Sequence, residues 1–92
     1  MGTKEYRYEH KLGKEEAMKR AGPFADNLAR KYMMKREDIP DGMHLVGKGV
    51  DAKVMVFEDH VVIAIEMNFL LEKIARGQIE SELNYKVPKA LG

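Results

Sequence analysis

The sequence predicts an α+β domain of element order β-α-β-β-β-α, an antiparallel four-stranded sheet with two helices packed on one face. Two observations predict it. Apolar residues recur at helical spacing in two segments, 13–34 and 69–86. Between them, residues 50–67 alternate strictly and indicate a β-hairpin. A chain of 92 residues suffices for one domain, expected to span 1–92 with flexible ends at 1–3 and 88–92.

The first strand is expected at 4–11, where tyrosines alternate weakly with charged residues. A helix follows over 13–34, and acid-before-base pairs four residues apart favour it. Gly22-Pro23 stands in the middle of this segment. Because proline removes a backbone hydrogen bond, we expect the helix to kink or divide there.

A polar connection is expected over 35–42, ending in the turn Ile39-Pro40-Asp41-Gly42. Three strands should follow at 43–48, 50–57 and 60–67, and Gly49 ends the first of them.

The hairpin between the last two strands has a well-specified register. With its tip at Glu58 and Asp59, every facing pair on one side is apolar: Val56–Val61, Val54–Ile63, Ala52–Ile65 and Val50–Met67. A slip by one residue would turn this whole row towards water, so the sequence favours one pairing.

The second helix is predicted to begin after the N-cap residue Asn68 and to end at Pro88. Its buried stripe is expected to contain Leu71, Ile74, Ala75, Ile79 and Leu83. Gly77 lies inside this helix and costs about 1 kcal/mol relative to alanine. We interpret it as permitting a close helix–helix or helix–sheet approach.

Two helices cover only one side of such a sheet, so the other side is expected to stay open. The candidate partner-contact residues on that side are Lys53, Met55, Phe57, Val62 and Ala64. Either His44 and Val46 or Met43 and Leu45 would join them, depending on the register of their strand. A semi-apolar face with marginal charges suits a protein partner, an apolar surface or a second copy. Scattered exposed apolar atoms are the plainer alternative.

Composition limits the function classes. The net charge of +1 gives no long-range field, so we expect no nucleic-acid partner. The absence of cysteine excludes disulfides and thiolate chemistry and fits a cytoplasmic location. The longest near-apolar stretch, 61–71, is too short to span a bilayer.

No catalytic, cofactor or metal site is predicted. His10, His44 and His60 lie on different elements, and none has a second ligand at metal-binding spacing. Thr3 and Ser81 lack the base and the orienting group that nucleophilic catalysis requires. We therefore expect a protein that is not an enzyme and needs no cofactor.

Three groups of residues resemble a known bacterial family. They are Leu12-Gly13 with Glu16-Ala17, Gly49-Val50-Asp51, and Phe69-Leu70-Leu71 with Gly77, Ile79 and Glu80. In this order and spacing, the chain resembles the small polyhydroxyalkanoic acid system proteins over about residues 10–87. It departs from their pattern at Gly22-Pro23 and in the connection through Pro40.

The resemblance implies a cytoplasmic protein linked to polyester storage granules, with no assigned catalytic residues. The leading hypothesis is a non-enzymatic accessory or binding protein that contacts the granule surface or a granule protein through the open sheet face. One alternative is a homodimeric interaction module that uses the same face. Another is a small hydrolase or isomerase acting on hydroxyacyl units, which would need a pocket with a carboxylate–histidine pair. The sequence offers no clear candidate for that pair.

Overall fold

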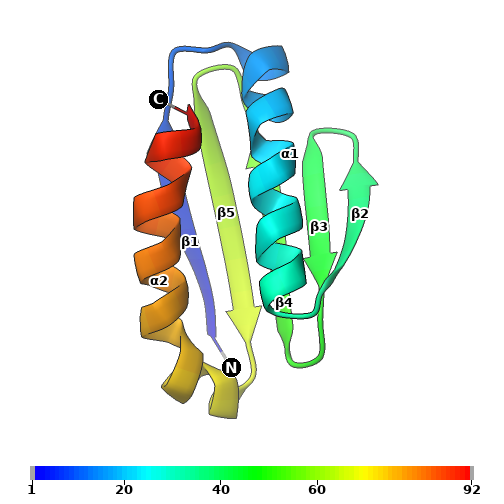
Figure 1. Ribbon diagram of the computed structural model, residues 1–92, viewed down its shortest axis with the longest axis vertical. Coiled ribbons are helices and arrows are strands. Elements are labelled where there is room, and N and C mark those ends of the chain that lie inside the picture. The colour runs from blue at the N-terminus through cyan, green and yellow to red at the C-terminus, as the bar shows by residue number, and fades with distance from the viewer. Residues whose placement is uncertain (1, 92) are drawn as a thin grey trace.

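The strands and helices follow the two periodicities of the sequence. The computed structural model describes residues 2–91, and Met1 and Gly92 lie outside the described residues. The elements are β1 (Gly2–Glu9), α1 (Lys14–Lys31), β2 (Lys35–Ile39), β3 (Gly42–Val46), β4 (Val50–Val56), β5 (His60–Met67) and α2 (Phe69–Leu91). The strands form one antiparallel sheet of order β1-β5-β4-β3-β2. Both helices lie side by side on one face of it (Figure 1).

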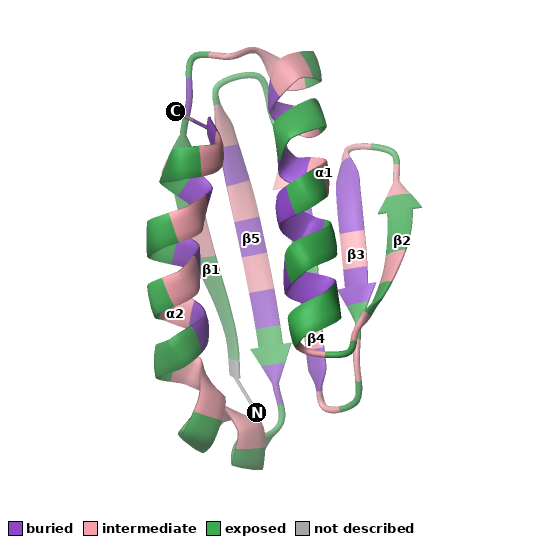
Figure 2. Cartoon of the chain, in the orientation of Figure 1, coloured by how far each residue is buried: buried purple, intermediate pink, exposed green. Residues whose placement is uncertain are grey.

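The predicted hairpin register is confirmed. Val54 pairs with Ile63 and Ala52 with Ile65, and each of these four side chains is at most 1% exposed. Figure 2 shows the result as alternating buried and partly exposed bands along β5. One row of both strands therefore faces the helices and forms the centre of the core.

Strand β2 was not predicted, so the sheet has five strands rather than four. The segment 35–39, expected to be a connection, pairs with β3 and places Arg36 opposite Leu45. Four of its five residues are charged, which hides the apolar signal of a strand. Charged side chains are common on edge strands because they discourage pairing with another chain. The predicted turn at 39–42 is confirmed as the tip of the β2–β3 hairpin.

Helix α1 is not divided at Gly22-Pro23, contrary to one of the two predicted outcomes. It runs without a break from Lys14 to Lys31. The ring of Pro23 lies on the exposed side, whereas Ala21 and Phe24 on either side of it are buried. Packing of this apolar face against the sheet compensates for the one lost backbone hydrogen bond.

Helix α2 differs from the prediction at its end and in its buried stripe. It continues past Pro88 because Val87 and Leu91 are buried and hold the last turn against the core. Its buried residues are Ile79, Leu83, Val87 and Leu91. Ile74 is 69% exposed, so its assignment to the stripe was wrong. Leu71 and Ala75 of the same turns pack against the core, so Ile74 lies on the outer side of α2.

The chain ends belong to regular elements where the structure describes them. Gly2 and Thr3 pair with Met67 and Glu66 in β1, which begins earlier than predicted. Residues 88–91 are helical. Of the ends expected to be flexible, residues 2–3 are thus part of the sheet and residues 88–91 part of α2, while Met1 and Gly92 lie outside the described residues. The predicted N-cap of α2 is also confirmed, because Asn68 Oδ1 accepts a hydrogen bond of 2.9 Å from the backbone N–H of Leu71.

A polar network ties β1 to α2. The Tyr6 hydroxyl donates to Glu80 Oε2 at 2.5 Å, and Lys4 Nζ donates to the same oxygen at 2.9 Å. Arg76 donates in turn to the Tyr6 hydroxyl at 3.2 Å. One carboxylate therefore receives two donors from β1, which fixes the position of α2 on that edge of the sheet.

This network predicts an acid-sensitive contribution to stability. The Tyr6 hydroxyl and the Lys4 ammonium hold the pKa of Glu80 below its ordinary value of 4.5. A carboxylate whose pKa is lowered by folding stabilises the native state above pH 4.5, and this contribution disappears as the pH falls through the lower folded pKa. Glu80→Gln should therefore lower the free energy of unfolding at neutral pH. Below pH 4.5, the free energy of unfolding of this variant should fall less steeply with decreasing pH than that of the wild type.

Urea unfolding of both proteins at a series of pH values measures this effect. Glu15→Gln, on the exposed side of α1, is the matched control and should retain the decline of the wild type. If Glu80→Gln and the wild type lost stability in parallel below pH 4.5, the Tyr6–Lys4 contact would have no such role.

Candidate contact surface on the open sheet face

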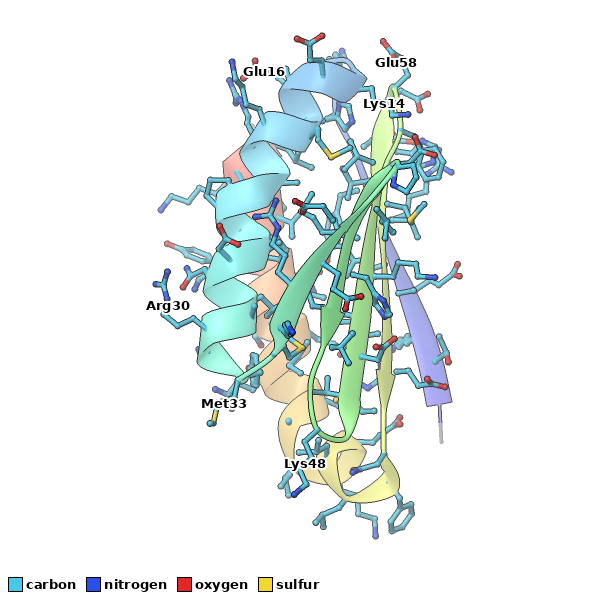
Figure 3. The ribbon with its side chains drawn as sticks, turned by 90° about the vertical axis from the view of Figure 1, so that its right-hand side faces the viewer. Lys14, Glu16, Arg30, Met33, Lys48 and Glu58 are labelled. Atoms are coloured by element: carbon cyan, nitrogen blue, oxygen red, sulfur yellow. The ribbon has the colours of Figure 1, made fainter. Side chains whose placement is uncertain are left out.

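The sheet face opposite the helices is not covered by any described part of the chain. Figure 3 shows both helices on one side of the edge-on sheet, and only side chains on the other. Met55 lies opposite Val62 and Lys53 opposite Ala64 on this open face, as predicted. The structure therefore brings four of the five candidate contact residues together at adjacent positions of β4 and β5.

Phe57, the fifth candidate, lies just beyond the end of β4 at the hairpin tip. Its side chain is 39% exposed and stacks on the His60 ring, with ring centroids 4.6 Å apart. It is thus at the margin of the open face rather than at its centre.

The register of β3 decides between the two alternatives that the sequence left open. Met43 and Leu45 point into the core and are 1% and 0% exposed. His44 and Val46 therefore lie on the open face, where His44 pairs with Lys53.

An apolar band crosses the open face one residue pair from the tip of the β4–β5 hairpin. The pairing of five strands puts Arg7, Val62, Met55, Gly42 and Ile39 in one row. Met55 and Val62 in the centre are partly exposed, and Ile39 extends the band onto the strand that was not predicted. The band is therefore wider than the sequence indicated.

Charged residues of both signs surround this band. On β1 they are Glu5, Arg7 and Glu9, on β2 Lys35 and Glu37, and on the central strands Asp51, Lys53 and Glu66. An apolar centre with a polar rim is the anatomy of a protein–protein interface. Sequence reasoning missed most of this rim, because the neighbours of the hairpin are set by contacts between distant segments.

The open face also carries a carboxylate–histidine pair, which the sequence analysis did not find. His44 Nε2 lies 2.8 and 2.9 Å from the two carboxylate oxygens of Asp51. The register of β3 on β4, which brings Val46 opposite Asp51, would have revealed this diagonal contact. The Asp51 side chain is 41% exposed and borders an open hollow of about 260 Å³ with Glu66 and Asn68.

The other two histidines contact backbone groups or an adjacent carboxylate. His10 is 8% exposed; its Nδ1 accepts from the backbone N–H of Leu12, and its Nε2 donates to the carbonyl of Phe57, both at 3.1 Å. His60 lies 2.6 Å from an oxygen of the neighbouring Asp59. Among residues 2–91, no three metal-binding side chains lie close enough to hold an ion. Within the same range, neither helix has the length and apolar character needed to cross a membrane.

Comparison with known proteins identifies the family. The family model described as "Putative polyhydroxyalkanoic acid system protein" matches residues 5–91. No curated protein and no solved structure shows significant similarity to the chain. The matched range contains all five strands, apart from the start of β1, and both helices. The chain therefore belongs to the polyhydroxyalkanoic acid system protein family.

Proposed function

We propose that the protein is a non-enzymatic accessory protein of polyhydroxyalkanoate storage granules, and that it binds a granule-associated protein in the cytoplasm through its open sheet face. Family membership supports the granule setting. The observation that carries the contact surface is the uncovered apolar band around Met55 and Val62, bordered by charges of both signs.

The charged rim favours a protein partner over the bare polyester. Lys53 and Glu5 flank Ala64 on the same face, so a ligand that covers the band also covers these charges. An apolar polymer offers them no counter-ions, and burial of unpaired charges is costly. A protein can supply complementary charges at the rim while it buries the apolar centre.

The surroundings of the His44–Asp51 pair support binding rather than catalysis. The pair lies on the open face beside the open hollow that Asp51 borders, with the two side chains 27% and 41% exposed to solvent. The Thr3 hydroxyl donates to Glu66 at 3.4 Å, and Ser81 lies on the exposed side of α2. Among the described residues neither hydroxyl is paired with this histidine, which favours a binding role over a hydrolase that uses a serine or threonine nucleophile.

The double variant Met55→Lys and Val62→Lys tests the proposal. Both side chains are partly exposed, so the variant should fold, while two lysines at the apolar centre should weaken partner binding by at least about 30-fold. Co-sedimentation with isolated granules that retain their protein coat measures binding, and circular dichroism confirms folding. Asn27→Lys, on the exposed face of α1, is the control and should bind like the wild type.

Bare polyester particles form the second arm of the experiment. We expect the wild type to sediment with coated granules and not with bare polymer. Undiminished sedimentation of the folded double variant with coated granules would contradict the proposed surface. Equal binding of the wild type to bare polymer would contradict the protein partner.

A further inference from the structure

The outer side of α2 carries a second surface, which no described part of the chain covers. We call this surface the outer stripe. Its residues follow one another at intervals of three or four, as on one face of a helix, and are Leu70, Ile74, Gly77, Ser81, Tyr85 and Pro88. All six residues are exposed, and none is charged. Leu70, Ile74 and Tyr85 are 65%, 69% and 66% exposed, more than any apolar side chain at the centre of the open sheet face. Helix α2 thus has apolar side chains on two sides, which is unusual for a helix that covers a core on one side only.

Gly77 lies in the middle of the outer stripe and has no packing role within the chain. A Cβ built on it would meet no atom of the described sheet or of α1 within 4 Å. The predicted close approach to another element of the same chain is therefore wrong. Glycine is a poor helix former, and at this position it leaves room for another helix to approach the backbone of α2.

The outer stripe is self-complementary in an antiparallel arrangement. Gly77 and Ser81 lie at equal distances on either side of Ile79, and so do Leu70 and Pro88. A second α2 in the opposite direction would therefore place Gly77 against Ser81 at the crossing point. It would place Ile74 beside Tyr85 of the second copy. Each contact occurs twice, as a two-fold symmetric interface requires.

The carboxylates of α2 do not oppose such a pair. Its three acidic residues already have basic partners within the chain: Glu72 with Arg76 at 3.1 Å, Glu80 with Lys4 at 2.9 Å, and Glu82 with Lys31 and Lys86. Lys73 and Lys89 lie over the rings of Phe69 and Tyr85. The approach of two copies therefore brings no unpaired carboxylates together on their facing sides.

We propose that the outer stripe is a homodimer interface in which α2 packs antiparallel against α2 of a second copy, with Gly77 and Ser81 at the crossing point. This interface is separate from the open sheet face and does not depend on the proposed function. A helix of 23 residues is about 35 Å long, so one helix–helix seam buries less than a standard interface. We expect a reversible dimer with a dissociation constant on the order of micromolar.

Sedimentation equilibrium over a wide range of protein concentrations tests the dimer. Ile74→Lys places a charge in the seam and should weaken dimerisation at least tenfold. Gly77→Leu should also weaken it at least tenfold, because the larger side chain blocks the crossing point. In the monomer, however, the Cβ of this leucine meets no atom of the described sheet or of α1, and its higher helix propensity should raise the midpoint of urea unfolding at low protein concentration.

A single cysteine locates the seam. The chain has no cysteine, so Ser81→Cys introduces one beside the proposed two-fold axis. A short bismaleimide should link two copies of this variant efficiently, whereas Lys53→Cys on the open sheet face should give little linked dimer.

Three outcomes would overturn the proposal. The first is a wild-type protein that stays monomeric throughout the concentration range. Binding of this monomer to lipid vesicles or polymer through the outer stripe would count as the same outcome. The second is a dimer that survives both stripe variants. The third is a dimer lost in the Met55→Lys and Val62→Lys variant, which would place the interface on the open sheet face. That variant should otherwise lose granule binding while it remains dimeric, so the two proposals fail separately.

Discussion

Replacement of Gly42 by alanine should destabilise the protein by more than about 3 kcal/mol, a large part of the stability of a small domain. A Cβ at this position would lie 1.8 Å from the carbonyl oxygen of Val54 and 2.8 Å from its carbonyl carbon. Both atoms belong to the backbone of β4, so neither can rotate away as a side chain would. Chemical denaturation followed by circular dichroism measures the loss.

Gly77→Ala is the matched control for this prediction. The same extra methyl group meets no atom of the sheet or of α1 there, and alanine is the better helix former. This variant should gain up to about 1 kcal/mol. A Gly42→Ala protein within about 1 kcal/mol of the wild type would show that β3 and β4 do not approach this closely.

Truncation of Leu83 should cost about 3–4 kcal/mol, whereas truncation of Ile74 in the same helix should cost less than about 0.5 kcal/mol. Leu83 is 0% exposed and Ile74 is 69% exposed. Leu83→Ala leaves a cavity between α2 and the sheet, while Ile74→Ala removes atoms that mainly contact water. Urea unfolding at low protein concentration, where dimerisation contributes little, compares the two variants. Equal costs would mean that the side chain of Ile74 packs against the core.

The β4–β5 hairpin and the cap of α2 could be predicted because both depend on local pattern. A strict two-residue alternation allows one register with an entirely apolar side, and Asn68 follows the last strand residue directly. The geometry of the open face around Met55 and Val62 follows from the same alternation.

Strand β2 and the burial of α2 could not be predicted from local pattern. Lys35–Ile39 is mostly charged, so only its pairing with β3 identifies it as a strand. Helix α2 has apolar residues on two sides, so periodicity alone does not show which side faces the sheet or where the sheet ends. Pro88 also suggested that α2 ends there, but the helix continues to Leu91, whose side chain is buried in the core.

The full extent of the open face could not be predicted, because it depends on which strands pair with each other. Arg7 and Ile39 lie in the row of Met55 and Val62 only because β1 pairs with β5 and β2 with β3. The same applies to His44 and Asp51, which the register of β3 on β4 brings to 2.8 Å. Long-range pairing thus supplied the charged rim that favours a protein partner.

Two surfaces on opposite sides of the sheet, neither covered by a described part of the chain, fit an adaptor. The open face would bind a granule protein, and the outer stripe would join two copies, so a dimer could present two binding faces. Each interface would then increase the apparent affinity of the other, because attachment at one site raises the effective concentration at the second.

Carbene footprinting of the protein, free and bound to coated granules, tests the contact surface most directly. We expect the labelling of Met55 and Val62 to fall on binding, while that of Asn27 on the far side of α1 stays the same. Unchanged labelling of the two sheet residues in granule-bound protein would contradict the role of the open face.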